Sequence, residues 1–148
     1  MRWYELDPGR LEHERSLLRN PWELVERGDG RLAWEGGTLV SSHRRRETPR
    51  RDVSLIYPKG FPARFIEARL DPDPPQEQWG MWLAHVNADG SACYVTADGW
   101  RPQDTVRDAL KLLDVWWWNY YWTCDPDAPR QPDPAFGFPW PRGKIAVP

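Results

Sequence analysis

The feature that most constrains this fold is a run of aromatic residues in the last third of the chain. Between positions 116 and 122 every residue except Asn119 is Trp or Tyr. These side chains bury large apolar areas, so the segment must lie in a core or form a binding surface. Apolar residues at helical spacing begin before this run and continue into it, so the sequence predicts a helix over about residues 103–122. They form one stripe, which consists of Val106, Leu110, Leu113 and Trp117.

Six aromatic residues exceed what one helical stripe can hold. Burial beneath the proline-rich segment that follows accounts for most of them, and any exposed ones would form a partner surface. A stacking platform for single-stranded nucleic acid is a further interpretation. The formal net charge of −2 argues against nucleic acid as a partner.

The length of 148 residues fits a single domain, residues 1–148, with a proline-rich tail at 124–148. No apolar run reaches the roughly 20 residues that span a bilayer, and no signal peptide is expected, so we predict a cytoplasmic protein without membrane contact. Cys93 and Cys124 make no zinc spacing with each other or with the three histidines. We therefore expect two free thiols, no metal and no cofactor.

Helical segments are predicted near the N-terminus. Asp7 is a preferred N-cap ahead of Pro8, and apolar residues recur at near-helical spacing as far as Trp22. Pro21 interrupts this pattern, and the residues around it have the form of a second cap. We expect residues 8–27 to form one kinked helix or two short helices.

A sheet is predicted in the middle of the chain. Gly36 and Gly37 favour a two-residue hairpin turn between the first two strands. Residues 58–62 contain two prolines, which cannot donate to a ladder, and must turn the chain. Strands joined by short loops favour an antiparallel meander. The four predicted strands are residues 32–35, 38–41, 53–57 and 65–70. Residues 71–75 leave the sheet, residues 79–94 are expected to be irregular, and the fold class is α+β.

Short motifs accompany these elements in a definite order. They are Tyr57-Pro58-Lys59-Gly60-Phe61-Pro62, His85-Val86-Asn87, Gly90-Ser91-Ala92-Cys93, Trp100-Arg101-Pro102 and Cys124-Asp125-Pro126. In this order they resemble the ubiquitin-conjugating enzyme family. The family pattern is a Tyr-Pro loop, a His-Pro-Asn motif, Gly-x-x-Cys and Trp-x-Pro ahead of a helix. The resemblance covers roughly residues 8–130 and implies the family's α+β fold.

The chain also departs from the usual form of that family. Val86 stands where the motif has proline, and the spacing from His85 to Cys93 is shorter than usual. No counterpart of the family's two further C-terminal helices is expected before Pro148. These differences resemble the reduced, bacterial branch, found beside ubiquitin-like proteins, activating enzymes and isopeptidases in conjugation or antiviral operons. The C-terminal residues lack a Gly-Gly end, so the chain is not expected to be the modifier itself.

The resemblance implies that Cys93 accepts a ubiquitin-like modifier from an activating enzyme as a thioester. An amine of a target protein then attacks the thioester, and the enzyme must position that amine and stabilise the oxyanion. Asn87 matches the motif asparagine, which donates to the oxyanion or braces its loop, while His85 is expected to be structural. Asp125 or Asp127 is expected to orient and deprotonate the incoming lysine. Trp100 and Pro102 are expected to support the site.

Other interpretations remain for the same residues. Cys93 is a buried core thiol in one of them, because free cysteines usually pack as small apolar groups. A non-catalytic module of the same fold would bind a modifier or another partner, and a cysteine hydrolase would need a histidine beside Cys93. Cys124 is expected to be an inert thiol at a helix end, and a redox pair with Cys93 is the alternative. The basic loop 44–51 is either a solvated loop or a site for an acidic partner or phosphate.

Overall fold

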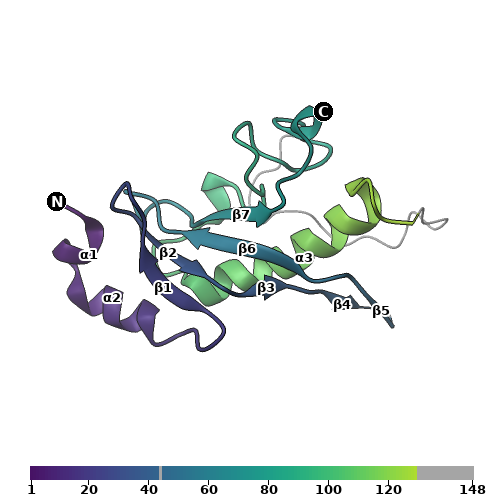
Figure 1. Ribbon diagram of the computed structural model, residues 1–148. Helices are drawn as coiled ribbons and strands as arrows, with labels where there is room; N and C mark the ends of the chain where they lie inside the picture. Colours follow the sequence, from purple (N-terminus) through teal and green to yellow (C-terminus); the bar gives the residue numbers. More distant parts are fainter. Residues whose placement is uncertain (44, 130–148) are drawn as a thin grey trace.

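The computed structural model describes residues 1–43 and 45–129 and contains both helices and an antiparallel sheet, which confirms the predicted α+β class (Figure 1). The helices are α1 (Trp3–Leu6), α2 (Pro8–Arg15) and α3 (Val106–Cys124), with 3-10 turns η1 (Gln76–Gln78) and η2 (Ala97–Gly99). The strands are β1 (Glu23–Glu26), β2 (Leu32–Glu35), β3 (Thr38–Leu39), β4 (Ser42–His43), β5 (Arg46–Glu47), β6 (Arg51–Ile56) and β7 (Glu67–Asp71).

The main sheet has five strands in the order β1-β2-β6-β3, with β7 also paired to β6. β1 pairs with β2, β2 and β3 both pair with β6, and β7 pairs with β6, all antiparallel. Since β2 pairs with residues 55–56 and β3 with residues 51–52, these two strands lie end to end along β6. The predicted antiparallel arrangement is therefore confirmed, although its strands are divided differently.

The hairpin predicted at Gly36 and Gly37 is wrong. Trp34 pairs with Leu55 and Thr38 with Asp52, so the chain advances four residues along β2 and β3 against three along β6. One extra residue on one strand is a β-bulge, and the strand continues through it. The chain reverses later, between β4 and β5.

The close approach of another segment explains the two glycines. Gly36 has a φ of +90°, and a Cβ there would meet the Pro21 carbonyl oxygen at 2.5 Å. A Cβ on Gly37 would meet the Trp22 ring at 2.0 Å. The glycines thus allow residues 21–22 to cross the bulge, which any side chain would prevent.

The second half of the helix predicted at residues 8–27 is also wrong, because residues 23–26 form β1. All four pair with β2, from Glu23 with Glu35 to Glu26 with Leu32. Tertiary pairing has overridden the near-helical spacing. The first half is confirmed: α2 begins at Pro8, and the Asp7 carboxylate accepts a hydrogen bond from the Arg10 N–H at 3.0 Å.

The long helix is confirmed, with its start three residues later than expected. Thr105 is the N-cap, and its N–H donates to Asp108 Oδ2 at 2.8 Å, which fixes the first turn. The helix lies across one face of the sheet (Figure 1). Its buried residues share one core with sheet residues that are cross-strand partners on a single face. From the helix they include Ala109, Leu113 and Trp117, and from the sheet Trp34, Leu55 and Ala68.

The aromatic run belongs mainly to the core. Trp116, Trp117, Trp118 and Tyr120 are each at most 1% exposed, and Tyr121 and Trp122 are half-buried. The Trp116 and Tyr120 rings stack with centroids 4.8 Å apart and planes 7° apart. The helix end is therefore packed on several sides, which explains how the core takes up more aromatic rings than one helical stripe holds.

A buried carboxylate connects α2 with the sheet and with α3. Glu14 is fully buried, and its Oε1 accepts hydrogen bonds from the Tyr57 hydroxyl and the Val106 N–H, both at 2.9 Å. Arg10 Nε lies 3.4 Å from Glu14 Oε2. Val106 is the first residue of α3, so the carboxylate lies at the positive end of the helix dipole. Burial and the nearby Glu14 charge raise the pKa of Tyr57 well above its ordinary value, so the hydroxyl remains a donor.

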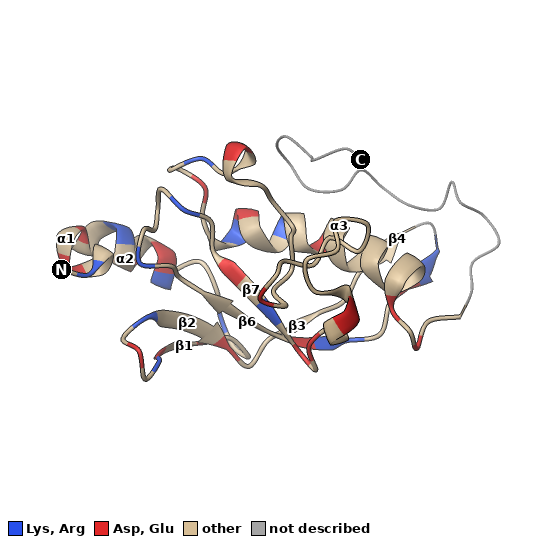
Figure 2. Cartoon of the chain, turned by 90° about the horizontal axis from the view of Figure 1, so that it is seen from above, with Lys and Arg blue, Asp and Glu red and all other residues tan. Residues whose placement is uncertain are grey.

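Charged residues of both signs are interspersed along the elements (Figure 2). None of the helices in the described part of the chain combines the length and the apolar character that a membrane crossing requires. The basic loop at 44–51 is divided between the β4–β5 turn, β5 and the start of β6, and its Arg44 lies outside the described residues. Most of the predicted proline-rich tail, residues 130–148, also lies outside them.

Candidate functional site

Cys93 ends a tight loop between β7 and α3. The Cys93 N–H donates to the His85 carbonyl at 2.9 Å, and Val86 and Ala92 form an isolated bridge. Within the loop, the Asn87 N–H donates to the Ser91 carbonyl at 2.8 Å. These three residue pairs close the loop on itself without forming a regular strand, in agreement with the irregular structure expected at residues 79–94.

The loop is fixed to the rest of the fold at two points. The Ala92 N–H donates to the Ala68 carbonyl of β7 at 2.9 Å. On the other side, Trp116 Nε1 of α3 donates to the His85 carbonyl at 2.8 Å, the same oxygen that accepts from Cys93. The backbone of Cys93 is thus held between the sheet and the long helix.

Asn87 braces the loop with its side chain. Its Nδ2 donates to Ser91 Oγ at 3.0 Å and to the Ala92 carbonyl at 3.3 Å. An amide nitrogen carries two protons, so both are engaged within the loop. Of the two roles predicted for Asn87, this arrangement favours bracing over direct donation to an oxyanion.

The turn at the tip of the loop is stabilised by charge and by close packing. Asp89 accepts hydrogen bonds from the Ser91 N–H at 3.0 Å and the Ser91 hydroxyl at 2.6 Å. Burial opposes ionisation of Asp89, but these hydrogen bonds and the Arg69 charge outweigh it and lower the pKa of the carboxyl. Gly90 has a φ of +89°, and a Cβ there would meet the Trp79 ring at 2.5 Å.

Cys93 itself is half-buried and has a free thiol. Burial raises its pKa above the ordinary value, so the protonated thiol predominates at neutral pH. A thiol of high pKa gives a more nucleophilic thiolate when it ionises, but it is a slower leaving group.

His85 contributes its backbone carbonyl to this arrangement. Its φ of +52° is uncommon for a residue with a side chain. The imidazole is buried, and burial lowers its pKa, so it is neutral at pH 7.

Trp100 and Pro102 join the segment before α3 to other parts of the fold. Trp100 is buried, and its Nε1 donates to the Pro62 carbonyl at 2.9 Å, which ties it to the turn after β6. The Pro102 carbonyl accepts from Arg10 Nη1 of α2 at 2.8 Å. Both residues therefore position segments that flank the Cys93 loop.

Asp125 lies at the C-terminal end of α3. Asp125 is the C-cap of α3, and its carboxylate is paired with Arg51 at 3.0 Å and accepts from the Asp127 N–H at 2.9 Å. Asp125 is also buried, while Asp127 is exposed. The predicted role of these two carboxylates toward a lysine stays a prediction.

A cleft of about 630 Å³ adjoins the loop. Its lining includes Asn87, Asp89 and Ser91 from the loop, Phe65 and Glu67 before and in β7, and Trp100. Three neighbouring apolar residues on the chain before the loop are exposed, which sequence reasoning did not single out: Met81 (44%), Trp82 (42%) and Leu83 (62%). In the sequence, their exposure was indicated by the fact that these apolar residues follow neither a helical nor a strand period.

Cys124 lies in the last turn of α3, where it was expected. Its thiol is half-buried, its Sγ lies 3.3 Å from Thr123 Oγ1, and burial raises its pKa. Both cysteines are free thiols, as expected from the sequence.

The pH dependence of alkylation tests the environment of Cys93. In a Cys124→Ser background, we expect iodoacetamide to react more slowly at pH 7 than with a free cysteine. The rate should rise about tenfold per pH unit and continue rising above the ordinary thiol pKa of about 8.5, because only the thiolate reacts. Urea-unfolded protein serves as the control and should level off near the ordinary value. A plateau below pH 8 in the folded protein would contradict the burial argument.

Comparison with family models, curated proteins and solved structures finds no match to this chain.

Proposed function

We propose that this chain is a ubiquitin-conjugating-type enzyme that carries a ubiquitin-like modifier on Cys93, in a reduced form of the ubiquitin-conjugating fold. The observation that carries the proposal is the position of Cys93. It is half-buried at the end of a loop that hydrogen bonds fix between β7 and α3. The order of elements, with helices, antiparallel sheet, cysteine loop and long helix, supports it further.

The proposed reaction has two balanced steps. The Cys93 thiolate attacks the carbonyl carbon of the activating enzyme's thioester, a new C–S bond forms, and the activating enzyme's thiolate leaves. An amine of the target then attacks the same carbon, the C–N bond of an amide forms, and Cys93 leaves and regains its proton.

The residues around Cys93 act by positioning. Asn87 holds the loop closed through Ser91 and Ala92, and Trp116 fixes the carbonyl that also binds the Cys93 N–H. These contacts hold the Cys93 sulfur in a fixed position. Positioning of the reacting groups is the main contribution that a protein makes to such a transfer. Asp125 or Asp127 would orient and deprotonate the amine, and Asp125 would first have to leave its ion pair with Arg51.

A non-catalytic binding module is the second candidate. Two observations favour it, namely the raised pKa of Cys93 and the engagement of Asp125 in an ion pair. Such a module would bind a ubiquitin-like protein or another partner without forming a covalent bond.

Acyl transfer to Cys93 distinguishes the two candidates. The protein is mixed with a ubiquitin-like protein carrying a C-terminal thioester, and separately with an activating enzyme, modifier and ATP. We expect a thiol-sensitive adduct on a non-reducing gel for the wild type and for the matched Cys124→Ser control. Cys93→Ala should form none, and Cys93→Ser should give a thiol-resistant oxyester. Binding of the modifier without any adduct would favour the module, and an adduct that persists in Cys93→Ala would show that Cys93 is not the acceptor.

A further inference from the structure

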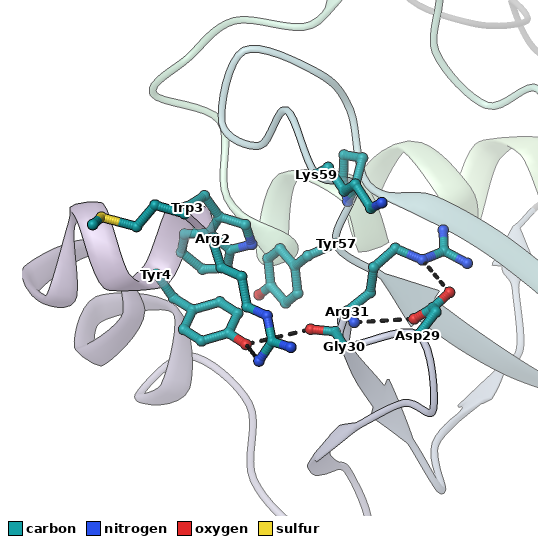
Figure 3. A pocket seen from close by; sticks show the side chains of 10 residues that line it. Arg2, Trp3, Tyr4, Asp29, Gly30, Arg31, Tyr57 and Lys59 are labelled. Atoms are coloured by element: carbon teal, nitrogen blue, oxygen red, sulfur yellow. Dashed lines mark hydrogen bonds and ion pairs between the residues drawn. The ribbon is translucent and has the colours of Figure 1, made fainter.

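A second recess lies near the N-terminus, where α1, the turn between β1 and β2 and the start of the loop after β6 meet (Figure 3). Its volume is about 360 Å³, within the range of small-molecule sites. Three cationic side chains line it, together with one carboxylate. They are Arg2, Arg31 and Lys59, with Asp29. Aromatic rings of Trp3, Tyr4 and Tyr57 form other parts of the wall.

Arg2 is seated in the recess by the residues around it. Its Nη1 donates to the Tyr4 hydroxyl at 2.9 Å and is paired with Glu26 Oε1 at 2.8 Å. Gly30 has a φ of +84°, and a Cβ there would meet Arg2 Nη2 at 2.6 Å. The guanidinium therefore occupies the space that any side chain at position 30 would fill.

Arg31, on the opposite side of the recess from Arg2, is held by Asp29 (Figure 3). Its Nε donates to Asp29 Oδ2 at 2.8 Å, and its own N–H donates to Asp29 Oδ1 at 3.0 Å. The backbone hydrogen bond from Arg31 lowers the pKa of Asp29, so this carboxylate is charged at neutral pH. Arg31 Nη1 lies farther, 3.9 Å, from Glu67 Oε1.

Among the residues that line the recess, three cations stand against one carboxylate, Asp29. Carboxylates beside the lining also contribute: Arg2 is paired with Glu26, and Arg31 with Asp29 and, at 3.9 Å, with Glu67. Lys59 is exposed, and within residues 1–43 and 45–129 the structure gives it no ion pair with a carboxylate. Figure 3 shows Lys59 and Arg31 on one side of the recess and Arg2 and Tyr4 on the other.

We propose that this recess binds a small anion that carries a phosphate group. The cationic groups come from three separate segments around the recess, so a tetrahedral anion there would be met from more than one side, whereas a planar carboxylate is better met by a single guanidinium. The volume exceeds that of phosphate alone, so it also accommodates the small organic group of a phosphate monoester. The site is separate from Cys93, and the proposal does not depend on the proposed conjugating activity.

The test uses the full chain with any purification tag at the C-terminal end, because Met1 lines the recess. Inorganic phosphate, phenyl phosphate and acetate are titrated at constant ionic strength, with amide NMR shifts of Asp29, Gly30 and Arg31 as the readout. We expect saturable shifts with both phosphates and weak, non-saturating shifts with acetate. Tighter binding of phenyl phosphate would assign the site to monoesters, and equal binding would assign it to the phosphate group alone.

Two variants should change the affinity in opposite directions. Lys59→Ala should weaken phosphate binding about tenfold, because it removes the unbalanced charge. Glu26→Gln should strengthen it, because the amide no longer neutralises Arg2. Exposed Lys111 on α3 provides the matched control, and Lys111→Ala should leave binding unchanged.

Gly30→Ala should also weaken binding, since the new methyl group displaces Arg2 and strains the positive φ. Any loss of folding in this variant would appear as a global change in the NMR spectrum and be excluded from the comparison. The proposal is overturned if wild-type shifts do not saturate, or if Lys59→Ala and Lys111→Ala bind phosphate alike.

Discussion

Replacing Glu14 with alanine is expected to lower the free energy of unfolding by about 3–5 kcal/mol, as removal of one partner from a buried charged network does. The side chain is fully buried and accepts hydrogen bonds from Tyr57 and from Val106. Its loss leaves the Val106 N–H without its acceptor and the nearby Arg10 charge without its carboxylate. A loss of this size is a large share of the 5–15 kcal/mol typical of a domain.

Urea denaturation followed by circular dichroism measures the effect. The matched control is Glu12→Ala, on the same helix, where the carboxylate is 72% exposed and paired loosely with Arg15. That variant should stay within about 0.5 kcal/mol of the wild type. If Glu14→Ala and Glu12→Ala unfold at similar urea concentrations, the network does not stabilise the fold.

A second large effect is expected from Trp116→Ala, with a loss of about 3–5 kcal/mol. The indole is 1% exposed and stacks on Tyr120, so its truncation opens a cavity in the core. The same change removes the Nε1 donor from the His85 carbonyl, which holds the Cys93 loop. Trp82→Ala is the control, since that ring is 42% exposed, and it should cost less than about 1 kcal/mol.

Trp116→Phe separates the packing from the hydrogen bond. Phenylalanine retains most of the ring volume but has no donor, so the stability loss should fall to about 1–2 kcal/mol. The Cys93 loop should nevertheless loosen, and the Cys93 alkylation rate at fixed pH should rise. An unchanged alkylation rate with a measurable stability loss would show that the Trp116 hydrogen bond does not fix the loop.

Several elements followed directly from local chemistry. Asp7 and Pro8 specify the start of α2, and the apolar stripe with its aromatic end specifies α3. The β-branched and aromatic residues at 53–57 and the alternation in residues 65–70 indicated the two strands that became β6 and β7, each displaced by about two residues. These features depend on neighbours in the sequence, so the sequence was sufficient to find them.

The strand at residues 23–26 and the bulge at Gly36 and Gly37 depended on partners far along the chain. A short segment with Trp22 and Val25 on one helical face also fits a strand, and pairing with β2 decided between them. Two glycines between apolar runs fit a hairpin as well as a bulge. Their role followed from the crossing of Trp22 over Gly37, which the sequence does not encode locally.

The burial of Glu14 likewise could not be predicted from its neighbours in the sequence. On a helix rich in charged residues it has the pattern of a solvated side chain, yet it is fully buried because α2 packs against Tyr57 and the first residue of α3. The position of Asp125 was open for a similar reason, since its pairing with Arg51 joins the end of α3 to β6.

The sequence alone therefore determined the α+β class, the long aromatic helix and the segment that carries Cys93, because each arises from short-range periodicity or turn chemistry. Tertiary packing decided which residues around Cys93 hold it, that Trp116 and Ala68 fix its loop, and that three cations meet near the N-terminus. These groups are separated by tens of residues along the chain, and the free energy of burying the core, not any local preference, brings them together.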